Sequence, residues 1–275
     1  MKTWFLPPDF TFTPDGPLQL GAVITHPGRP TNVIASPRTD PSLQLPEIQI
    51  ITEKNHSHSN EVSRKGGVSL FAKFVEFASG SVSYEASRRN LLQYGTVDHE
   101  VRSLLAPFSK DFLQSIISLD AVKEHIDSGL YGKRPIYLVS GLRVTNESFT
   151  VTKEKGTGNQ AEISASGPTG SVPVEVGGSL SGGVEKTKAD SYETAPGIIF
   201  AYRLHVIRPR SGKTTQSEMF SSSKGLWTEK VESEPMEVLD VTLDVVRDDF
   251  EEEEITFDQA DLGDGEFCLQ TRLFP

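Results

Sequence analysis

Residues 149–184 read FTVTKEKGTGNQAEISASGPTGSVPVEVGGSLSGGV. Apolar and polar residues alternate along two arms, which flank the turn signal Gly167-Pro168-Thr169-Gly170. The alternation predicts β-strands, but the apolar residues are too few and too small for an ordinary core hairpin. Long, weakly amphipathic strands are typical of membrane-spanning hairpins, and a soluble protein can also hold them on its surface. The stretch therefore predicts a hairpin that is compatible both with a bilayer and with the surface of a soluble protein.

Two nearly continuous apolar segments, residues 135–144 and 198–207, bracket this hairpin. Such segments are typical of central strands that are buried on both faces. The hairpin, which we place at residues 148–193, is therefore expected to emerge between the central strands of a core sheet.

The rest of the chain predicts an α+β fold with a twisted, mostly antiparallel central sheet and a few short helices. Residues 1–47 are rich in proline and predict irregular structure with short extended pieces, and Glu47–Glu53 predicts a strand. Two helices are expected, with Ser109 capping Lys110–Ser118 and Asp120 capping Ala121–Ser128.

Residues 66–88 are ambiguous, because their apolar residues fit both a long strand and one face of a helix. We favour the strand, since Ser79-Gly80-Ser81 is poor helix-forming material.

Composition limits the class of protein. The chain has 275 residues, of which 36% are hydrophobic, so it is long enough for one large domain or two small ones. No segment approaches the roughly 18 apolar residues of a transmembrane helix. The proline-interrupted start does not predict a secretory signal, and the single cysteine, Cys268, excludes an internal disulfide. A cytoplasmic location of the inactive protein is therefore expected.

Charge is distributed unevenly along the chain. Residues 229–275 carry 16 acidic and 3 basic side chains, whereas residues 1–228 carry 22 acidic and 24 basic ones. We therefore predict a body at 1–228 and an acidic C-terminal tail at 229–275, which either shields a basic surface or only aids solubility. The densest acidic residues are Asp248, Asp249, Glu251, Glu252, Glu253 and Glu254.

No catalytic, cofactor or metal site is predicted. Ser211-Gly212-Lys213-Thr214 resembles a phosphate-binding loop, but Ile207 stands where that motif needs its first glycine. His56 and His58 lack the further ligands of a structural zinc site. We therefore expect a non-enzymatic protein with no small-molecule substrate and, without a recognised motif, no nucleic-acid partner.

Basic residues gather near the ends of the amphipathic segments. Anionic lipid headgroups attract such residues by roughly 1 kcal/mol each, although ordinary solvated strand ends have the same pattern. The predicted headgroup-binding residues are Arg64, Lys65, Arg88, Arg89, Lys153, Lys155, Lys186, Lys188, Arg208, Arg210 and Lys213.

The order of these elements resembles a known family. Two short helices precede GKRPIYLVSGLRVT at 132–145, the amphipathic hairpin follows, and TAPGIIFAYRL at 194–204 comes next. This order is similar to that of the pore-forming domain of gasdermins, and most similar to the fungal gasdermin-like regulators of cell death. The resemblance is best over residues 90–210.

The resemblance implies a protein that binds acidic phospholipid, oligomerises and permeabilises the plasma membrane. Two segments, roughly 60–95 and 148–193, would refold into transmembrane hairpins, and many copies, of this chain or of a related one, would close a β-barrel, since lipid tolerates no open sheet edge. The residues expected to insert are Val68, Leu70, Phe74, Val82, Tyr84, Phe149, Val151, Ile163, Val172, Val174, Val176, Leu180 and Val184.

Two features differ from the animal members of that family. These 275 residues contain no large helical inhibitory domain, and the proline-rich start does not predict a basic amphipathic first helix. The acidic tail is therefore the segment expected to restrain the protein, by masking basic strand ends until it is cleaved or displaced. Two alternatives stay open: a β-rich module that docks a partner by strand addition, and an enzyme of unrecognised type.

Overall fold

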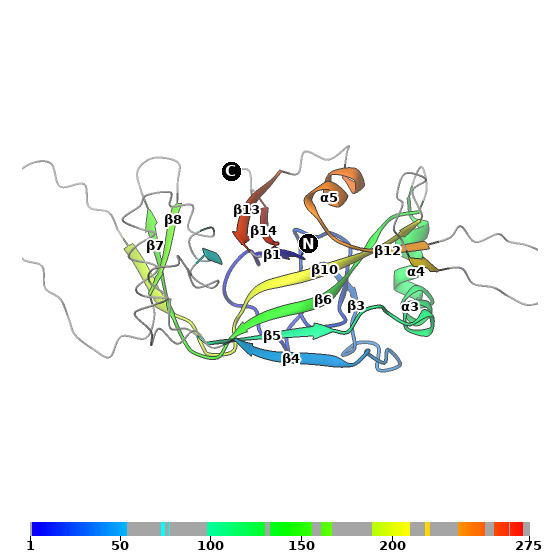
Figure 1. The fold of residues 1–275 in the computed structure, drawn as a ribbon, viewed down its shortest axis with the longest axis horizontal. Helices are drawn as coiled ribbons and strands as arrows, with labels where there is room; N and C mark the ends of the chain where they lie inside the picture. The colour runs from blue at the N-terminus through cyan, green and yellow to red at the C-terminus, as the bar shows by residue number, and fades with distance from the viewer. Residues whose placement is uncertain are drawn as a thin grey trace, which may run out of the picture. The chain divides into compact units, whose positions relative to one another are not determined.

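The computed structural model has an α+β fold with a mixed sheet and, in the described part of the chain, three short helices (Figure 1). The contacts divide the chain into unit 1, residues 1–51, 101–144 and 199–275, and unit 2, residues 52–100 and 145–198. The structure describes residues 2–53, 73, 74, 77, 98–129, 133–155, 161–166, 189–209, 218–220, 236–250, 256–263 and 265–271.

The strands form two sheets. The larger sheet contains β1 (Lys2–Phe5), β2 (Val23–Ile24), β3 (Val33–Ala35), β4 (Ile48–Glu53), β5 (His99–Leu104), β6 (Ile136–Thr145), β10 (Ile199–Pro209), β11 (Glu218–Phe220), β12 (Met236–Asp240), β13 (Phe257–Gly263) and β14 (Glu266–Thr271). The smaller sheet contains β7 (Thr150–Lys155), β8 (Ala161–Ser166) and β9 (Ala189–Glu193). The helices are α3 (Lys110–Ile117), α4 (Asp120–Asp127) and α5 (Leu243–Asp249).

The strand order of the larger sheet is β13-β14-β1-β10-β6-β2-β3. β6 also pairs with β5, which pairs with β4, and β10 also pairs with β12, which pairs with β11. β10 is antiparallel to β1, β6 and β12, whereas β1 and β14 run parallel. The sheet is therefore mixed, with β6 and β10 at its centre.

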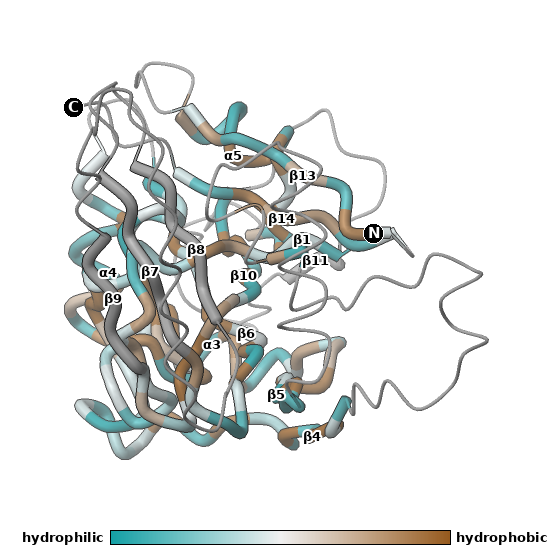
Figure 2. The backbone as a smooth tube through the Cα atoms, turned by 90° about the vertical axis from the view of Figure 1, so that its left-hand side faces the viewer, coloured by the Kyte–Doolittle hydropathy of each residue, from teal (hydrophilic) through white to brown (hydrophobic). Residues whose placement is uncertain are grey.

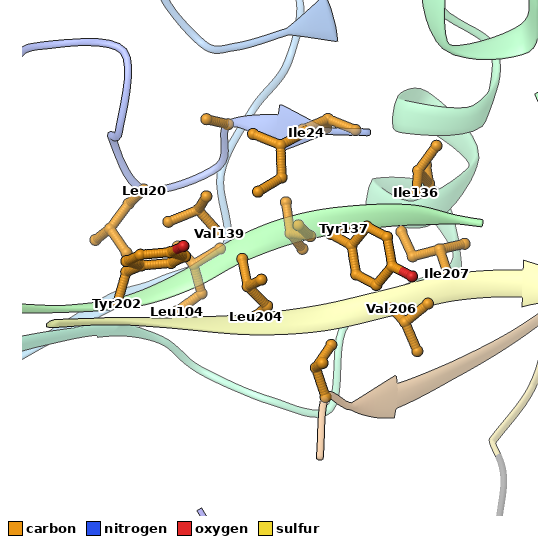
Figure 3. Close-up of a cluster of buried hydrophobic side chains, with 14 of the residues drawn as sticks. Leu20, Ile24, Leu104, Ile136, Tyr137, Val139, Tyr202, Leu204, Val206 and Ile207 are labelled. Atoms are coloured by element: carbon orange, nitrogen blue, oxygen red, sulfur yellow. The ribbon is translucent and has the colours of Figure 1, made fainter. Parts of the chain in front are cut away.

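The core of unit 1 is built on these two central strands. β6 is buried at every position from Ile136 to Thr145, and β10 contributes Tyr202, Leu204, Val206 and Ile207 to the same cluster (Figure 3). Both strands are apolar on both faces, because helices and loops cover one side and the other strands supply the second. The prediction of two central, two-sided strands is confirmed.

The two predicted helices are confirmed, with one cap in error. The hydroxyl of Ser109 accepts a hydrogen bond from the amide of Phe112 at 3.2 Å, as expected of an N-cap. Leu119, not Asp120, occupies the N-cap of α4 and makes no side-chain cap bond. Asp120 is instead the first helical residue, where its charge still complements the amino-terminal end of the helix.

The strand predicted for residues 66–88 is wrong at the residues that the structure describes. Lys73, Phe74 and Phe77 are helical, and Phe74 is only 1% exposed. Burial of an apolar helical face here outweighs the poor helix propensity of the downstream Ser-Gly sequence. The other residues of that segment lie outside the described part of the chain.

The first arm of the predicted hairpin is two strands rather than one. β7 and β8 pair antiparallel, with Thr150 opposite Ser166 and Lys155 opposite Ala161, and β9 pairs with the other edge of β7. The physical reason is in the sequence between β7 and β8, where Gly156, Gly158 and Asn159 are turn formers. The second predicted arm, residues 171–184, lies outside the described residues.

The described residues of the acidic segment are integrated into unit 1. β12 pairs with β10, β14 pairs with β1, and Val241, Val246 and Leu269 are buried. This arrangement differs from the predicted division into a body and a tail. Residues 229–275 are highly charged, but the apolar side chains spaced among the charges belong to the core. Figure 1 shows α5 and the β13–β14 pair beside the rest of unit 1.

Candidate functional site: carboxylates around Arg208

Arg208 lies near the carboxyl end of the central strand β10, which also carries the polar residues Arg203 and His205. It is only 8% exposed, and the register between β10 and β12 places it directly opposite Glu237. Its Nε donates a hydrogen bond to Oε1 of Glu237 at 3.0 Å. Because Glu237 is fully buried, each of the two charges needs the other.

Helix α5 brings two further carboxylates to the same guanidinium. The hydroxyl of Thr242 caps the helix by accepting from the amide of Val245. One turn later, Oδ2 of Asp248 lies 3.0 Å from a terminal nitrogen of Arg208, which also donates to Asp249. Three carboxylates from β12 and α5 therefore surround one cation of β10.

Tyr137 completes the cluster from β6. Its hydroxyl donates to Oδ2 of Asp249 at 2.7 Å, and its ring stacks on Phe250, the residue that ends α5. The ring of Phe250 also contacts His26, with 4.6 Å between the two centroids. The helix is thus held to the sheet by charge at Asp249 and by aromatic contact at Phe250.

The electrostatics of the cluster favour a charged Arg208. Burial by itself disfavours the guanidinium cation, but the carboxylates of Asp249, Glu237 and Asp248 outweigh that effect and raise the pKa of Arg208. Removing one of these partners would leave a buried charge uncompensated, which is far more costly than breaking a surface ion pair. In this conformation the guanidinium is directed to the carboxylates and not to an external anion.

His26, beneath α5, is the second titratable group of this region. Its Nδ1 accepts a hydrogen bond from the amide of Gly28 at 2.9 Å, and its Nε2 is buried without a hydrogen-bond partner among the described residues. Burial, assisted by the nearby charge of Arg29, lowers the pKa of His26 to about 4. The ring is therefore neutral at neutral pH.

In unit 2, the β7–β9 pairs have the same offset as the pair Val144–Ile199, which lies at one end of the β6–β10 ladder in unit 1. Between the two ladders, the amide of Thr145 donates to the carbonyl of Ile198, and that of Thr194 to the carbonyl of Phe149. Residues 146–149 and 194–198 are not in strands, and the β6–β10 ladder itself shifts register between Ile199 and Ala201 and between Arg203 and Leu204. The common register therefore holds for the pairs next to the break and not along the whole of β6 and β10.

In the smaller sheet, the strand register also places apolar residues opposite one another at one position and polar residues opposite one another at the next. Val151 is opposite Ala165 and Tyr192. The neighbouring position, Thr152, is opposite Ser164 and Ser191. One set of alternating positions is thus partly apolar and the other is polar.

The structure joins one predicted headgroup-binding residue, Arg208, to two predicted restraining residues, Asp248 and Asp249. It places Lys153, Lys155, Val151 and Ile163 on β7 and β8, and it buries Phe74 and Phe149. The remaining predicted site residues lie outside the described part: Arg64, Lys65, Val68, Leu70, Val82, Tyr84, Arg88, Arg89, Val172, Val174, Val176, Leu180, Val184, Lys186, Lys188, Arg210, Lys213, Glu251, Glu252, Glu253 and Glu254.

Sequence reasoning missed Glu237 and Tyr137. Glu237 was counted only as one more charge of the acidic segment, and Tyr137 only as a core residue of β6. The signal that could have found Glu237 is the arginine itself, because a basic residue at the end of an apolar strand needs a buried counter-charge.

A serine, a histidine and an aspartate also meet in unit 1. Ser140 Oγ lies 2.7 Å from Nδ1 of His205, whose Nε2 lies 3.3 Å from Asp240. Ser140 is only 2% exposed, and burial lowers the pKa of His205 to about 4, although Asp240 opposes the shift. A weak base beside a hydroxyl that a substrate cannot reach does not make a nucleophile, so we assign this chain of hydrogen bonds to the core.

No family model and no curated protein matches the sequence. Among the described helices, none is both long and apolar enough to cross a membrane. The geometry on its own therefore carries the functional argument.

Proposed function

We propose that this chain is a gasdermin-like, non-enzymatic pore former that binds acidic phospholipid and assembles, with copies of itself or of a related chain, into a transmembrane β-barrel. Permeabilisation of the plasma membrane would then cause cell death. In this proposal the resting form is cytoplasmic. The observation that carries the proposal is the common register of the β6–β10 and β7–β9 ladders.

The common register matters because a bilayer needs long, continuously paired strands. A membrane-spanning strand takes about 9–11 residues, and its backbone groups must all be hydrogen-bonded. The path from β6 through β7 covers residues 136–155, and the path from β9 through β10 covers residues 189–209. A hairpin that keeps the register of the Val144–Ile199 pair can lengthen at its far end, provided that residues 146–149 and 194–198, which are not in strands in this structure, join the ladder.

Residue types in the smaller sheet support the same proposal. Strands that span a membrane alternate between a lipid-facing and a lumen-facing set. The register gives β7 and β8 one set that contains Val151, Ile163 and Ala165 together with Lys153 and Lys155, and a second set that is polar throughout. Such strands tolerate water in the resting state and lipid in the inserted state.

The cluster around Arg208 supplies a restraint in this proposal. A guanidinium that is paired with Asp248, Asp249 and Glu237 is not available to a lipid phosphate. Displacing α5 would remove Asp248 and Asp249 from the guanidinium and leave Glu237 of β12 as its remaining carboxylate partner among those described. The acidic residues would thus act through direct contacts within the folded sheet.

Release of an encapsulated dye from liposomes tests the proposal. We expect the full chain to release dye from vesicles that contain phosphatidylserine and not from vesicles of phosphatidylcholine alone. A matched pair of variants, Val151→Lys and Thr152→Lys, adds the same charge to adjacent positions of β7. Val151 is opposite Ala165 and Tyr192, whereas Ile163 already lies opposite Lys153. In a barrel, a lysine at mid-depth on the lipid side costs roughly 2–4 kcal/mol, whereas one on the lumen side costs little.

Val151→Lys is therefore expected to abolish leakage, and Thr152→Lys to retain it. Circular dichroism of both variants checks that the resting fold is intact. If both variants leak equally, β7 does not insert. If no form leaks at any lipid composition, the pore proposal is wrong and the docking module becomes the better explanation.

A further inference from the structure

β4 exposes an apolar surface on both of its faces. Every residue from Ile48 to Thr52 is exposed, and Glu53 is half-buried. The exposed fractions of Ile48, Ile50 and Ile51 are 43%, 58% and 48%. Part of the β4 tube is coloured as hydrophobic in Figure 2. Large aliphatic side chains gathered on one exposed strand usually mark an interaction surface.

The strand also lies at an end of its sheet. β4 pairs with β5, and no other described strand pairs with it (Figure 1). Proteins normally protect such an edge with a lysine, a proline or a bulge. The sequence of β4, Ile-Gln-Ile-Ile-Thr-Glu, contains neither lysine nor proline. An apolar edge without these protections is suited to the addition of another strand.

A second copy of β4 fits this edge. Two six-residue strands overlap fully in an antiparallel pair in only one register, with Ile48 opposite Glu53, Gln49 opposite Thr52, and Ile50 opposite Ile51. Two-fold symmetry repeats each pair, so an Ile–Ile pair forms on each face of the joined sheet.

Registers shifted toward the amino terminus of β4 are worse. Centring the two-fold axis on Ile50 brings Glu47 opposite Glu53 of the second copy, and like charges directly opposite each other are destabilising. A further shift in the same direction brings Pro46 into the ladder, where it cannot donate a hydrogen bond.

We propose that β4 is a homodimer interface, at which two copies of the chain join their sheets through antiparallel β4 strands around a two-fold axis. The interface covers Ile50 and Ile51 and pairs the edge of β4 that no described strand occupies. It does not depend on the membrane activity proposed above. Since only one short strand from each copy takes part, the dimer is expected to be weak and to dissociate on dilution.

Sedimentation equilibrium of the full chain over about 1–100 μM tests the interface. We expect a dimer that dissociates on dilution. Ile50→Lys should lower the association constant about tenfold or more, because each of the two central Ile–Ile pairs then becomes a Lys–Ile pair. Gln259→Lys is the matched control, since it adds the same charge to an exposed position of β13, another strand at an end of the sheet. A wild-type chain that stays monomeric, or an Ile50→Lys chain that dimerises like the control, would overturn the proposal.

Cysteine cross-linking tests the register. Directly opposed residues of an antiparallel pair lie within disulfide range. A mixture of Ile50→Cys and Ile51→Cys chains should therefore form a covalent heterodimer on mild oxidation. Either variant alone should not, because two copies of residue 50 lie on opposite faces of the joined sheet. The native Cys268 is buried and does not compete. Efficient cross-linking of Ile50→Cys with itself would show that this register is wrong.

Discussion

Arg143 on β6 stacks its guanidinium on the indole ring of Trp4, with its central carbon 4.5 Å from the ring centroid. A terminal nitrogen of Arg143 also donates to Glu266 at 2.8 Å, and the indole N–H of Trp4 donates to the same carboxylate oxygen at 3.1 Å. One buried arginine thus ties the central strand β6 to β1 and β14.

Replacing this arginine by lysine tests the value of that contact. Arg143→Lys keeps the charge but loses the planar stacking and the geometry of the guanidinium. We expect the free energy of unfolding to fall by about 1–3 kcal/mol, as measured by urea denaturation. Arg134 is exposed, so Arg134→Lys serves as the control and should change little. Equal effects of the two substitutions would contradict the stacking argument.

The carboxylates around Arg208 make a prediction about activity. Asp248→Asn combined with Asp249→Asn removes two charges that hold Arg208, so liposome leakage should begin at lower protein concentration than in the wild type. Asp244 is on the same helix and is exposed; Asp244→Asn removes one charge without touching Arg208 and should behave like the wild type. The free energy of unfolding, measured on the same samples, distinguishes a folded double variant with a displaced α5 from a variant that has lost its fold. Unchanged leakage in a folded double variant would rule out this restraint.

The buried His26 predicts a pH dependence of stability. Its folded-state pKa is about 4 instead of the usual 6.5, so between these values the unfolded chain binds the proton more readily. The contribution of the neutral His26 ring to the free energy of unfolding is therefore complete above pH 6.5 and is lost as pH falls to about 4. The loss amounts to up to about 3 kcal/mol.

Denaturation of the wild type and of His26→Gln at pH 7 and pH 5 measures this contribution. The glutamine cannot take up the proton, and its amide oxygen can still accept from Gly28. The loss of stability on acidification should be smaller in the variant. Because His205 is present in both proteins, the difference between them isolates His26. Parallel pH profiles would show that protonation of His26 is not involved.

A glycine at a tight turn gives a prediction about packing. Gly21 has φ +80°, and a Cβ there would lie 2.2 Å from a methyl carbon of Leu45 and 3.0 Å from the ring of Pro37. Gly265 has φ +75° but open space around the same position. Gly265→Ala should therefore cost only the backbone strain, about 1–2 kcal/mol. Gly21→Ala should cost about 1–3 kcal/mol more. Similar unfolding midpoints for the two variants would contradict the predicted clash.

The sequence predicted the centre of the fold well, because continuous burial leaves a simple pattern. β6 and β10 are apolar at nearly every position, so their place between other strands could be predicted without knowing their partners. Ser109 was equally recognisable, since capping depends on a hydroxyl one residue before a helix.

Patterns that depend on distant partners could not be predicted. β12 and β14 belong to a strongly acidic segment, and only their pairing with β10 and β1 makes them core strands. The helix around Phe74 competes with a strand of the same composition, and burial decides between them. The cluster around Arg208 was predicted in part: Arg208, Asp248 and Asp249 were singled out for different reasons, but nothing local indicated that they touch.

The pairing of β1 with β14 has a consequence for synthesis in the cell. Lys2–Phe5 is translated before the other described strands, yet one of its two neighbours in the sheet, Glu266–Leu269, belongs to the described strand that is translated after all the others. A nascent chain can close the β6–β10 pair before it can close the edge beside it, and contacts of such high sequence separation form slowly. This edge therefore waits until the other strands have been made, and a chaperone that shields β1 during elongation would be expected to improve the yield of folded protein.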